Sequence, residues 1–356
     1  MIAHSSSDLR AADLEHLPGV LSRNFLGDGP LCAELRELLR ARFDCAHVVL
    51  THSATAALRL GLIALREQAP TRTRILIGGY VCPAVISAIR QADLLPLFAD
   101  IAEGSLRIDF AGSRTRIDST VLAVVCTSAG GVPDPYDAAE SLGVPVISDC
   151  AQAVGTRLGG SDLATRGCCA VLSFGSTKVI TAGSGGALLV RSEPLGRRLV
   201  ELAREELPDA RYAGGEFPVT WGQQLGELLA GLVRSQLSRL EEGLESRRSI
   251  ADRYDTALEG WGTHRLVREA PGERFNRFRY YFLSAQAEAW VAHLRSCGVD
   301  ARRSISHAMG TLYGDPAQLP QLVRWSDRVV SVPIYPRLSE AEVARIVAGL
   351  ESGPSA

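Results

Sequence analysis

Lysine is almost absent from this 356-residue sequence. Lysine and arginine together total 38, and Lys178 is the one lysine among them. Arginine can replace lysine wherever a positive charge or a hydrogen-bond fork is enough, but a guanidinium stays protonated and does not attack a carbonyl. A lysine amine can lose its proton and form an imine. Lys178 is therefore a candidate for chemistry of that kind, with an accidental surface position as the alternative.

Cysteine pairs with metal or redox spacing are also missing. The sequence has eight scattered cysteines and no C-x-x-C motif, so neither a zinc site nor a redox motif has the spacing that it needs. We predict no bound metal, and we predict buried, reduced thiols that pack as small hydrophobes. The cysteines are Cys32, Cys45, Cys82, Cys126, Cys150, Cys168, Cys169 and Cys297.

The chain has neither a strong charge imbalance nor a long apolar run. Its formal net charge of -2 gives no sign of a nucleic-acid or membrane partner. No stretch is long enough to span a bilayer, and the first residues contain no apolar run of the signal-peptide kind. We therefore expect a cytoplasmic protein that acts on small molecules, with a hydrophobic fraction of 46% that is ample for a core.

Short apolar runs rich in Val, Ile and Leu alternate with stretches of helical period. Strands that are apolar throughout, with helices between them, indicate an α/β domain with a mostly parallel sheet covered on both faces. We place this large domain at residues 15–245. The expected strands are 74–77, 94–98, 121–127, 144–148, 169–174 and 186–191, and the expected helices are 55–66, 82–92, 135–142 and 195–206.

The C-terminal part of the sequence has a different texture. A long periodic helix is expected over 223–259, and a small α+β domain over 246–356. Ser339 followed by Glu342 is a capping box, which predicts the start of the last helix. The other expected elements are strands at 265–269, 279–284 and near 328–332, and helices at 286–297 and 340–351.

Small hydroxyl residues lead into the first expected helix of the large domain. Ser53, Ala54 and Thr55 would present backbone N–H groups, hydroxyl donors and the positive end of the helix dipole, which together favour a phosphate. A simple helix cap is the alternative for this segment. Ligands of open parallel sheets bind beyond the carboxyl ends of the strands, which is where this segment is expected.

A carboxylate and an amide follow the strand expected at 144–148. Asp149 could pair with a protonated pyridine nitrogen and keep the ring cationic, so that it accepts electrons from a carbanion. A metal ion or a ribose would suit the same carboxylate. Gln152 is placed to hydrogen-bond a phenolic oxygen of such a ring, or simply to cap the turn.

The lysine itself follows the next strand. Ser173 could donate to a phosphate, and Lys178 lies five residues later on a loop that can fold back over the cleft. The glycines within 182–187 then permit a close backbone approach. The order of phosphate cap, D-x-x-Q and S-x-x-x-x-K is more specific than any one motif, and the fingerprints of dinucleotide and P-loop sites are absent.

Distinctive segments occur along nearly the whole chain. They are GDGPLCAELRELL, SATAAL, PLFADI, GVPDPYD, ISDCAQAVG, SFGSTK, VDARRSISHAM and VVSVPIYPRLSEAEV. Together they resemble the motifs of the DegT/DnrJ/EryC1/StrS family of sugar aminotransferases. SATAAL is similar to the family's S-G-T-A-A-L, ISDCAQAVG to its E-D-x-A-Q-A-x-G, and SFGSTK to its S-F-x-x-T-K.

The resemblance implies a fold type I enzyme that carries pyridoxal 5'-phosphate (PLP) and works as a homodimer with shared active sites. It implies transfer of an amino group from a donor, typically L-glutamate, to a keto group of a sugar or sugar-like acceptor in secondary-metabolite or surface-sugar biosynthesis. Lys178 would form the Schiff base and move the proton, with Asp149 at the pyridine nitrogen and Gln152 at the ring oxygen. The phosphate would be held by Ser173, Ala54 and Thr55, and Ala151 would pack on a ring face.

Several positions depart from the family pattern. Gly222 and Gln224 replace the usual Asn and Arg, so a phosphate contact from the partner subunit is missing. Cys82 stands where an aromatic residue normally stacks on the ring, and Tyr80 is the candidate to replace it. The usual H-L-Y-G reads as the small residues 128–131. His307 corresponds to a late family histidine, with substrate contact or a structural role as alternatives.

Other functions are compatible with the same residues. The family's dehydratase branch carries a histidine in place of the lysine, so Lys178 argues against it. A lysine-bound PLP can also support elimination, decarboxylation or cyclisation of a non-sugar substrate. A PLP-binding regulator or a catalytically silent partner subunit would not need the amine.

Overall fold

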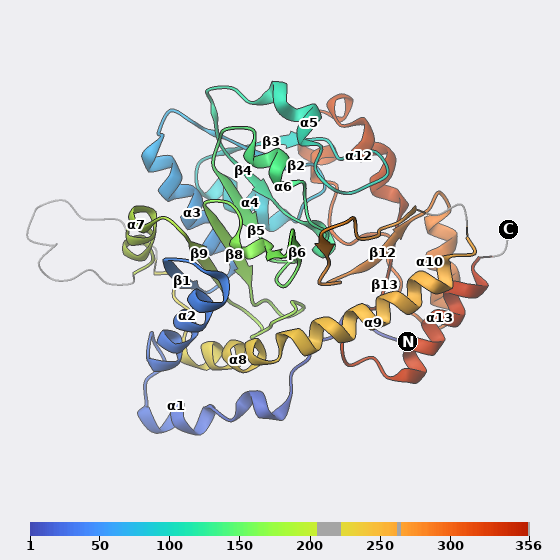
Figure 1. Cartoon of the computed structure of the whole chain (residues 1–356), viewed down its shortest axis with the longest axis horizontal. Coiled ribbons are helices and arrows are strands. Elements are labelled where there is room, and N and C mark those ends of the chain that lie inside the picture. The colour runs from blue at the N-terminus through green and yellow to red at the C-terminus, as the bar shows by residue number, and fades with distance from the viewer. Residues whose placement is uncertain (205–221, 262–264, 355–356) are drawn as a thin grey trace, which may run out of the picture.

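A seven-stranded sheet forms the centre of the computed structural model, which describes residues 1–204, 222–261 and 265–354 (Figure 1). The strand order is β1-β9-β8-β5-β4-β2-β3. Strand β9 is antiparallel to both of its neighbours, whereas the other adjacent strands are parallel, so the predicted mostly parallel sheet is confirmed. The strands are β1 (His47–Thr51), β2 (Arg74–Gly78), β3 (Leu95–Ala99), β4 (Val121–Cys126), β5 (Val146–Asp149), β8 (Cys169–Ser173) and β9 (Gly186–Val190).

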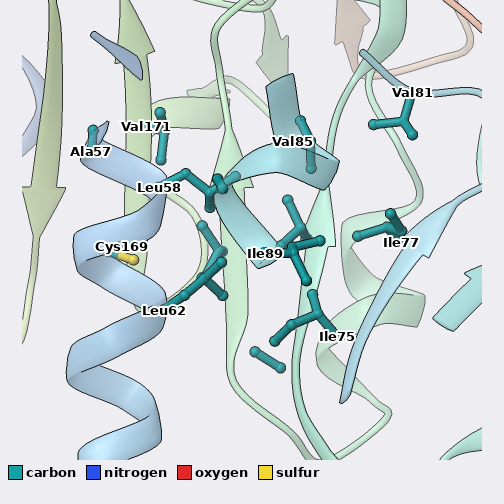
Figure 2. Packing of buried hydrophobic residues seen from close by; sticks show 14 of the residues in the cluster. Ala57, Leu58, Leu62, Ile75, Ile77, Val81, Val85, Ile89, Cys169 and Val171 are labelled. Atoms are coloured by element: carbon teal, nitrogen blue, oxygen red, sulfur yellow. The ribbon is translucent and has the colours of Figure 1, made fainter. Parts of the chain in front are cut away.

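Helices cover both faces of this sheet because its strands are apolar on both sides. In β2, Ile75 and Ile77 face one core and Leu76 faces the other, as the two-residue period of a strand requires. Figure 2 shows α3 and α4 packed on the first of these cores, with Leu62 and Ile89 directed at the sheet. The covering helices are α2 (Pro30–Phe43), α3 (Ala54–Gln68), α4 (Pro83–Gln91), α6 (Tyr136–Glu140), α7 (Glu193–Ala203) and α8 (Glu227–Ser238).

The strands expected from apolar runs in the large domain are all present, with small differences at their ends. Strand β1 was not among them. It is short, and it joins the sheet by pairing with β9, which lies far along the chain. Minor elements among the described residues include α1 (Leu17–Arg23), α5 (Phe110–Ser113), α11 (Met309–Tyr313), α12 (Pro320–Trp325), β6 (Arg157–Leu158), β7 (Ser161–Asp162) and β11 (Glu273–Arg274).

The prediction of one continuous helix over 223–259 is wrong, because two consecutive helices occupy this stretch. Helix α8 ends before Arg239, whose φ of -113° and ψ of 17° leave the helical region, and α9 (Leu240–Leu258) follows at once. The Arg239 guanidinium forms an ion pair with the buried Asp13 carboxylate. A partner from the N-terminal segment accompanies the break, so helical periodicity alone could not indicate it.

The C-terminal part packs a small antiparallel sheet against helices. Trp290 is fully buried at its centre, with Trp261 and Phe282 edge-on at ring-centre distances of 5.1 and 5.2 Å. Along α9, Leu244 belongs to the core of the large sheet and Ile250 to this second core. This change supports the division at 245/246 that we propose. The elements are β10 (Arg265–Leu266), β12 (Tyr280–Leu283), β13 (Val329–Val332), α10 (Ala287–Ser296) and α13 (Glu340–Ser352).

Two smaller expectations concern cysteines and membrane spans. All eight cysteines are free, and five of them are buried, whereas Cys82, Cys168 and Cys297 are partly exposed. In the described ranges, no helix combines the length and the apolar character that crossing a bilayer requires.

The capping box of α13 gives a testable prediction about stability. Ser339 Oγ accepts the Glu342 N–H at 3.3 Å, and the Glu342 carboxylate accepts the Ser339 N–H at 2.9 Å, as the sequence predicted. We expect Ser339→Ala to lower the free energy of unfolding by about 1 kcal/mol, because helix N–H groups lose their acceptor. Thermal unfolding measures this loss.

Ser192→Ala is the matched control for that measurement. Ser192 occupies the same cap position of α7, but its side chain forms no capping hydrogen bond. Equal destabilisation by the two substitutions would contradict the capping interpretation.

Candidate active site

A cavity of about 340 Å³ lies beyond the carboxyl ends of the parallel strands. Its volume is within the range of small-molecule and cofactor sites. It lies at the sheet edge where ligands of open α/β folds bind. The lining includes every residue that the sequence proposed as a cofactor contact: Ser53, Ala54, Thr55, Tyr80, Cys82, Asp149, Ala151, Gln152, Ser173 and Lys178.

A larger groove of about 1150 Å³ lies elsewhere, between the N-terminal segment, α2 and α8. It is more open, and its lining includes neither Lys178 nor Asp149. Size alone therefore does not locate the chemistry, and we take the smaller cavity as the candidate active site.

The start of α3 forms one wall of the cavity. Ser53 is the N-cap residue, and its Oγ accepts the Ala56 N–H at 3.2 Å, so it does cap the helix. The N–H groups of the first turn and the dipole of this 15-residue helix still favour an anion. A Cβ at Gly186 would lie 2.5 Å from the Ala54 nitrogen, so this glycine is what permits β9 to approach the helix start.

Asp149 is the last residue of β5, and only 6% of it is exposed. Its Oδ1 accepts the Ala151 N–H at 3.0 Å. Burial raises the pKa of Asp149 to about 6, while the Ala151 N–H and the Lys178 charge act in the opposite direction. A buried carboxylate with one hydrogen bond retains acceptor capacity for a cationic donor in the cavity.

Lys178 lies on the loop after β8. Its backbone N–H donates to the Gly175 carbonyl at 3.0 Å, which closes a turn. Burial lowers the pKa of Lys178, and the negative charge of Asp149 opposes this effect. The amine is therefore neutral over a wider pH range than an exposed lysine, which makes it the better nucleophile.

Gln152 is held in a defined orientation. Its Oε1 accepts the Gly130 N–H at 2.7 Å, so the amide nitrogen Nε2 is left to donate. In the part of the chain that the structure describes, Nε2 has no acceptor within hydrogen-bonding distance. This geometry suits a donor to an oxygen of a bound ring.

Tyr80 and Cys82 line the side of the cavity formed by the start of α4. The Tyr80 hydroxyl accepts the Ile305 and Ser306 N–H groups at 3.1 and 3.2 Å. Burial raises the pKa of Tyr80 to about 12, so the hydroxyl stays protonated at neutral pH. Cys82 is the N-cap residue of α4 and is partly exposed.

His307 does not belong to the cavity lining, whereas its neighbour Ser306 does. The side chain of His307 is exposed, and its carbonyl accepts the Val81 N–H at 2.9 Å. Gly222 and Gln224 also lie outside the lining. Gly222 has a φ of 51°, a left-handed conformation that favours glycine.

The small residues at 128–131 do not leave empty space. A Cβ at Gly130 would lie 2.8 Å from Ile305 Cδ1 and 3.0 Å from Tyr281 Cε1. Side chains from the C-terminal part thus occupy the volume that a larger residue at 130 would need.

Sequence reasoning missed the contribution of the segment before β12. The Lys178 Nζ lies 5.2 Å from the centre of the Phe278 ring, and the Arg279 Cζ lies 4.4 Å from the same centre. Burial lowers the pKa of Arg279 to about 10. Among the described residues, no carboxylate forms an ion pair with Arg279. In the sequence, Phe278 and Arg279 show no pattern that indicates a functional site. Their relation to Lys178 becomes visible only in the folded chain.

Across residues 1–204, 222–261 and 265–354, no group of three or more His, Cys, Asp or Glu side chains is arranged to hold an ion.

Known proteins resemble this chain over most of its length. The GDP-perosamine synthase of Vibrio cholerae is 23% identical over 330 residues, which cover 88% of this chain and 87% of that protein. The crystal structure of the sugar aminotransferase CalS13 from Micromonospora echinospora superposes with a TM-score of 0.91 at 25% identity, covering 99% of this chain and 100% of the other.

Two further comparisons point the same way. AtS13 from Actinomadura melliaura has a TM-score of 0.89 at 25% identity and is covered to 99%, as is this chain. The putative sugar aminotransferase Spr1654 of Streptococcus pneumoniae, solved in a PMP form, shares the fold with a TM-score of 0.88 at 18% identity over 99% of this chain and 98% of its own.

The model of the DegT/DnrJ/EryC1/StrS aminotransferase family matches residues 7–351, and the chain therefore belongs to that family.

Proposed function

We propose that this protein is a PLP-dependent aminotransferase that moves an amino group from an amino acid, probed first with L-glutamate, to a keto group of a sugar or sugar-like acceptor. One observation carries the proposal. The single lysine of the chain lines the same cavity as a buried carboxylate, a helix N-terminus and an oriented amide. These are the four kinds of group that lysine-bound PLP requires.

The charges and hydrogen-bonding groups of the cavity residues suit the ring nitrogen, the phosphate and the ring oxygen of the cofactor. Bound PLP supplies an electron-accepting ring that stabilises negative charge at the substrate carbon. Asp149 would hold a proton on the ring nitrogen, since a buried carboxylate strongly favours a cationic partner. The first turn of α3 and Ser173 would hold the phosphate, and Gln152 Nε2 would donate to the ring oxygen.

Lys178 has two tasks in this proposal. Its lowered pKa provides the neutral amine that bonds to the cofactor. With the cofactor bound, the same amine would accept and return a proton at the substrate carbon, because Lys178 lines the cavity. Ala151, Tyr80 and Cys82 would flank the ring.

The acceptor class rests on the aminotransferase family and on the similarity to the sugar aminotransferase CalS13. The homodimer with shared active sites also belongs to the proposal, as does a cytoplasmic location.

Reduction of the purified protein with borohydride in the presence of PLP tests the lysine assignment. We expect one peptide, the one containing Lys178, to carry the reduced cofactor, because the chain offers no other lysine. Mass spectrometry of the digest measures this. Lys178→Ala is the control, and labelling of that variant to the same extent would refute the assignment.

Absorbance before and after addition of L-glutamate, without acceptor, tests the reaction type. Conversion of the lysine-bound form to the pyridoxamine-phosphate form would support transamination. A lysine-bound form that ignores all common amino donors would instead favour elimination, decarboxylation or cyclisation, or a binding-only protein.

Asp149→Asn is expected to raise stability and lower activity. The pKa of Asp149 is about 6 in the folded chain and 3.8 ordinarily, so the folded state binds the proton more tightly. The wild type therefore loses stability as the pH rises from about 4 through 6, while the variant does not titrate. Denaturant unfolding of the cofactor-free proteins measures this effect. The free energy of unfolding of the variant minus that of the wild type should be larger at pH 7 than at pH 4, by up to about 3 kcal/mol.

The same variant should lose at least about a hundredfold in the rate of the glutamate half-reaction, since a neutral amide does not hold the ring nitrogen protonated. Asp162→Asn is the matched control. Its pKa is also raised to about 6 by burial, but it lies outside the cavity lining. Equal rate losses in both variants would mean that Asp149 has no special role.

A further inference from the structure

Asn276 is a completely buried amide in the segment between β11 and β12. Its Nδ2 donates to the Gln152 carbonyl at 2.9 Å and to the Val154 carbonyl at 2.9 Å. Its Oδ1 accepts the Phe278 N–H at 2.9 Å. One side chain from the C-terminal part thus joins the loop after β5 to the residue whose ring faces Lys178.

The surroundings of Asn276 are built tightly around this amide. A Cβ at Gly131 would lie 1.9 Å from Asn276 Oδ1, and Gly131 has a φ of 89°, so only glycine suits this position. Thr156 Oγ1 accepts the Asn276 N–H at 3.1 Å and donates to the Gly131 carbonyl at 2.8 Å. The hydrogen bonds form a closed network that fixes residues 130–131 against Asn276.

This network holds Gln152 at both ends. Asn276 binds its backbone carbonyl, and the Gly130 N–H binds its side-chain oxygen at 2.7 Å. The direction in which Gln152 Nε2 points into the cavity therefore depends on Asn276. Removing a buried amide of this kind costs free energy, because its hydrogen-bond partners stay buried and cannot bond to water instead.

We propose that Asn276 is a positioning residue, which aims Gln152 at the ring oxygen of the cofactor and keeps Phe278 beside Lys178. This inference rests on the proposed function, because it requires bound PLP. It adds a residue that none of the sequence motifs contains and that belongs to the C-terminal part of the chain.

The consequence for the cofactor is electrostatic. An N–H donor at the ring oxygen stabilises negative charge there, and most strongly when the adjacent lysine–cofactor nitrogen carries no proton. Correct placement of Gln152 therefore lowers the pKa of that nitrogen, and misplacement raises it. This pKa is read from the absorbance of the lysine-bound cofactor as a function of pH, without any turnover.

We expect Asn276→Ser to raise the midpoint of that titration by about one pH unit, a tenfold change in the proton equilibrium. Serine introduces no charge, and its single hydroxyl cannot donate to the Gln152 and Val154 carbonyls at the same time. Thr156→Val perturbs the same network from outside and is the second variant if Asn276→Ser does not fold; its midpoint should rise in the same direction. Thermal unfolding is recorded for each variant.

Tyr254→Phe is the matched control for lost stability. The buried Tyr254 hydroxyl donates to the Pro333 carbonyl at 3.0 Å in the C-terminal core, away from the cavity. We expect Tyr254→Phe to lower the unfolding temperature and leave the titration midpoint unchanged. A midpoint that rises as much in this control would overturn the inference, since general loosening would then explain it.

The double variant Asn276→Ser with Gln152→Ala tests whether Asn276 acts through Gln152. Without the glutamine side chain there is no amide to misplace, so Asn276→Ser should add no further rise. An undiminished additional rise would reject this route, and an unchanged midpoint in Asn276→Ser alone would reject the inference. A wild-type protein that never forms the lysine-bound cofactor would instead refute the proposed function itself.

Discussion

The charge interaction between Asp149 and Lys178 in a buried cavity is the constraint on which the rest of the site depends. Each group is largely withdrawn from water, which raises the pKa of the acid and lowers that of the amine. Each also favours the charged form of the other. A buried acid and amine with shifted pKa values are typical of functional sites. In the proposed function, a bound cationic ring and the lysine-linked cofactor would use both groups.

The sheet makes this arrangement geometrically simple. Strands β5 and β8 are parallel neighbours, so Asp149 and Ser173 emerge at the same edge, and the loop after β8 returns Lys178 to it. The start of α3 reaches that edge through β1, which pairs with the antiparallel β9. Figure 1 shows the helices packed on both faces, so the strand ends are the part of the sheet that ligands can reach.

The C-terminal part of the chain does more than cover the large sheet. Phe278 contacts Lys178, the Ile305 and Ser306 N–H groups bind the Tyr80 hydroxyl, and Tyr281 fills the space beside Gly130. Asn276 connects this part to Gln152. Ser306 is the residue of this part that lines the cavity, and the other contacts hold the smaller part against residues around Lys178.

The sequence by itself determined the α/β class, most strand positions, the capping box of α13, the family and the residues that gather around Lys178. These depend on local periodicity, on the order of motifs and on the chemistry that only an amine can perform. Only the tertiary structure decided the break at Arg239, the pairing of β1, the orientation of Gln152 and the contacts of Phe278 and Asn276. Each of these rests on a contact between segments far apart in the chain, and no local pattern of residues records such a contact.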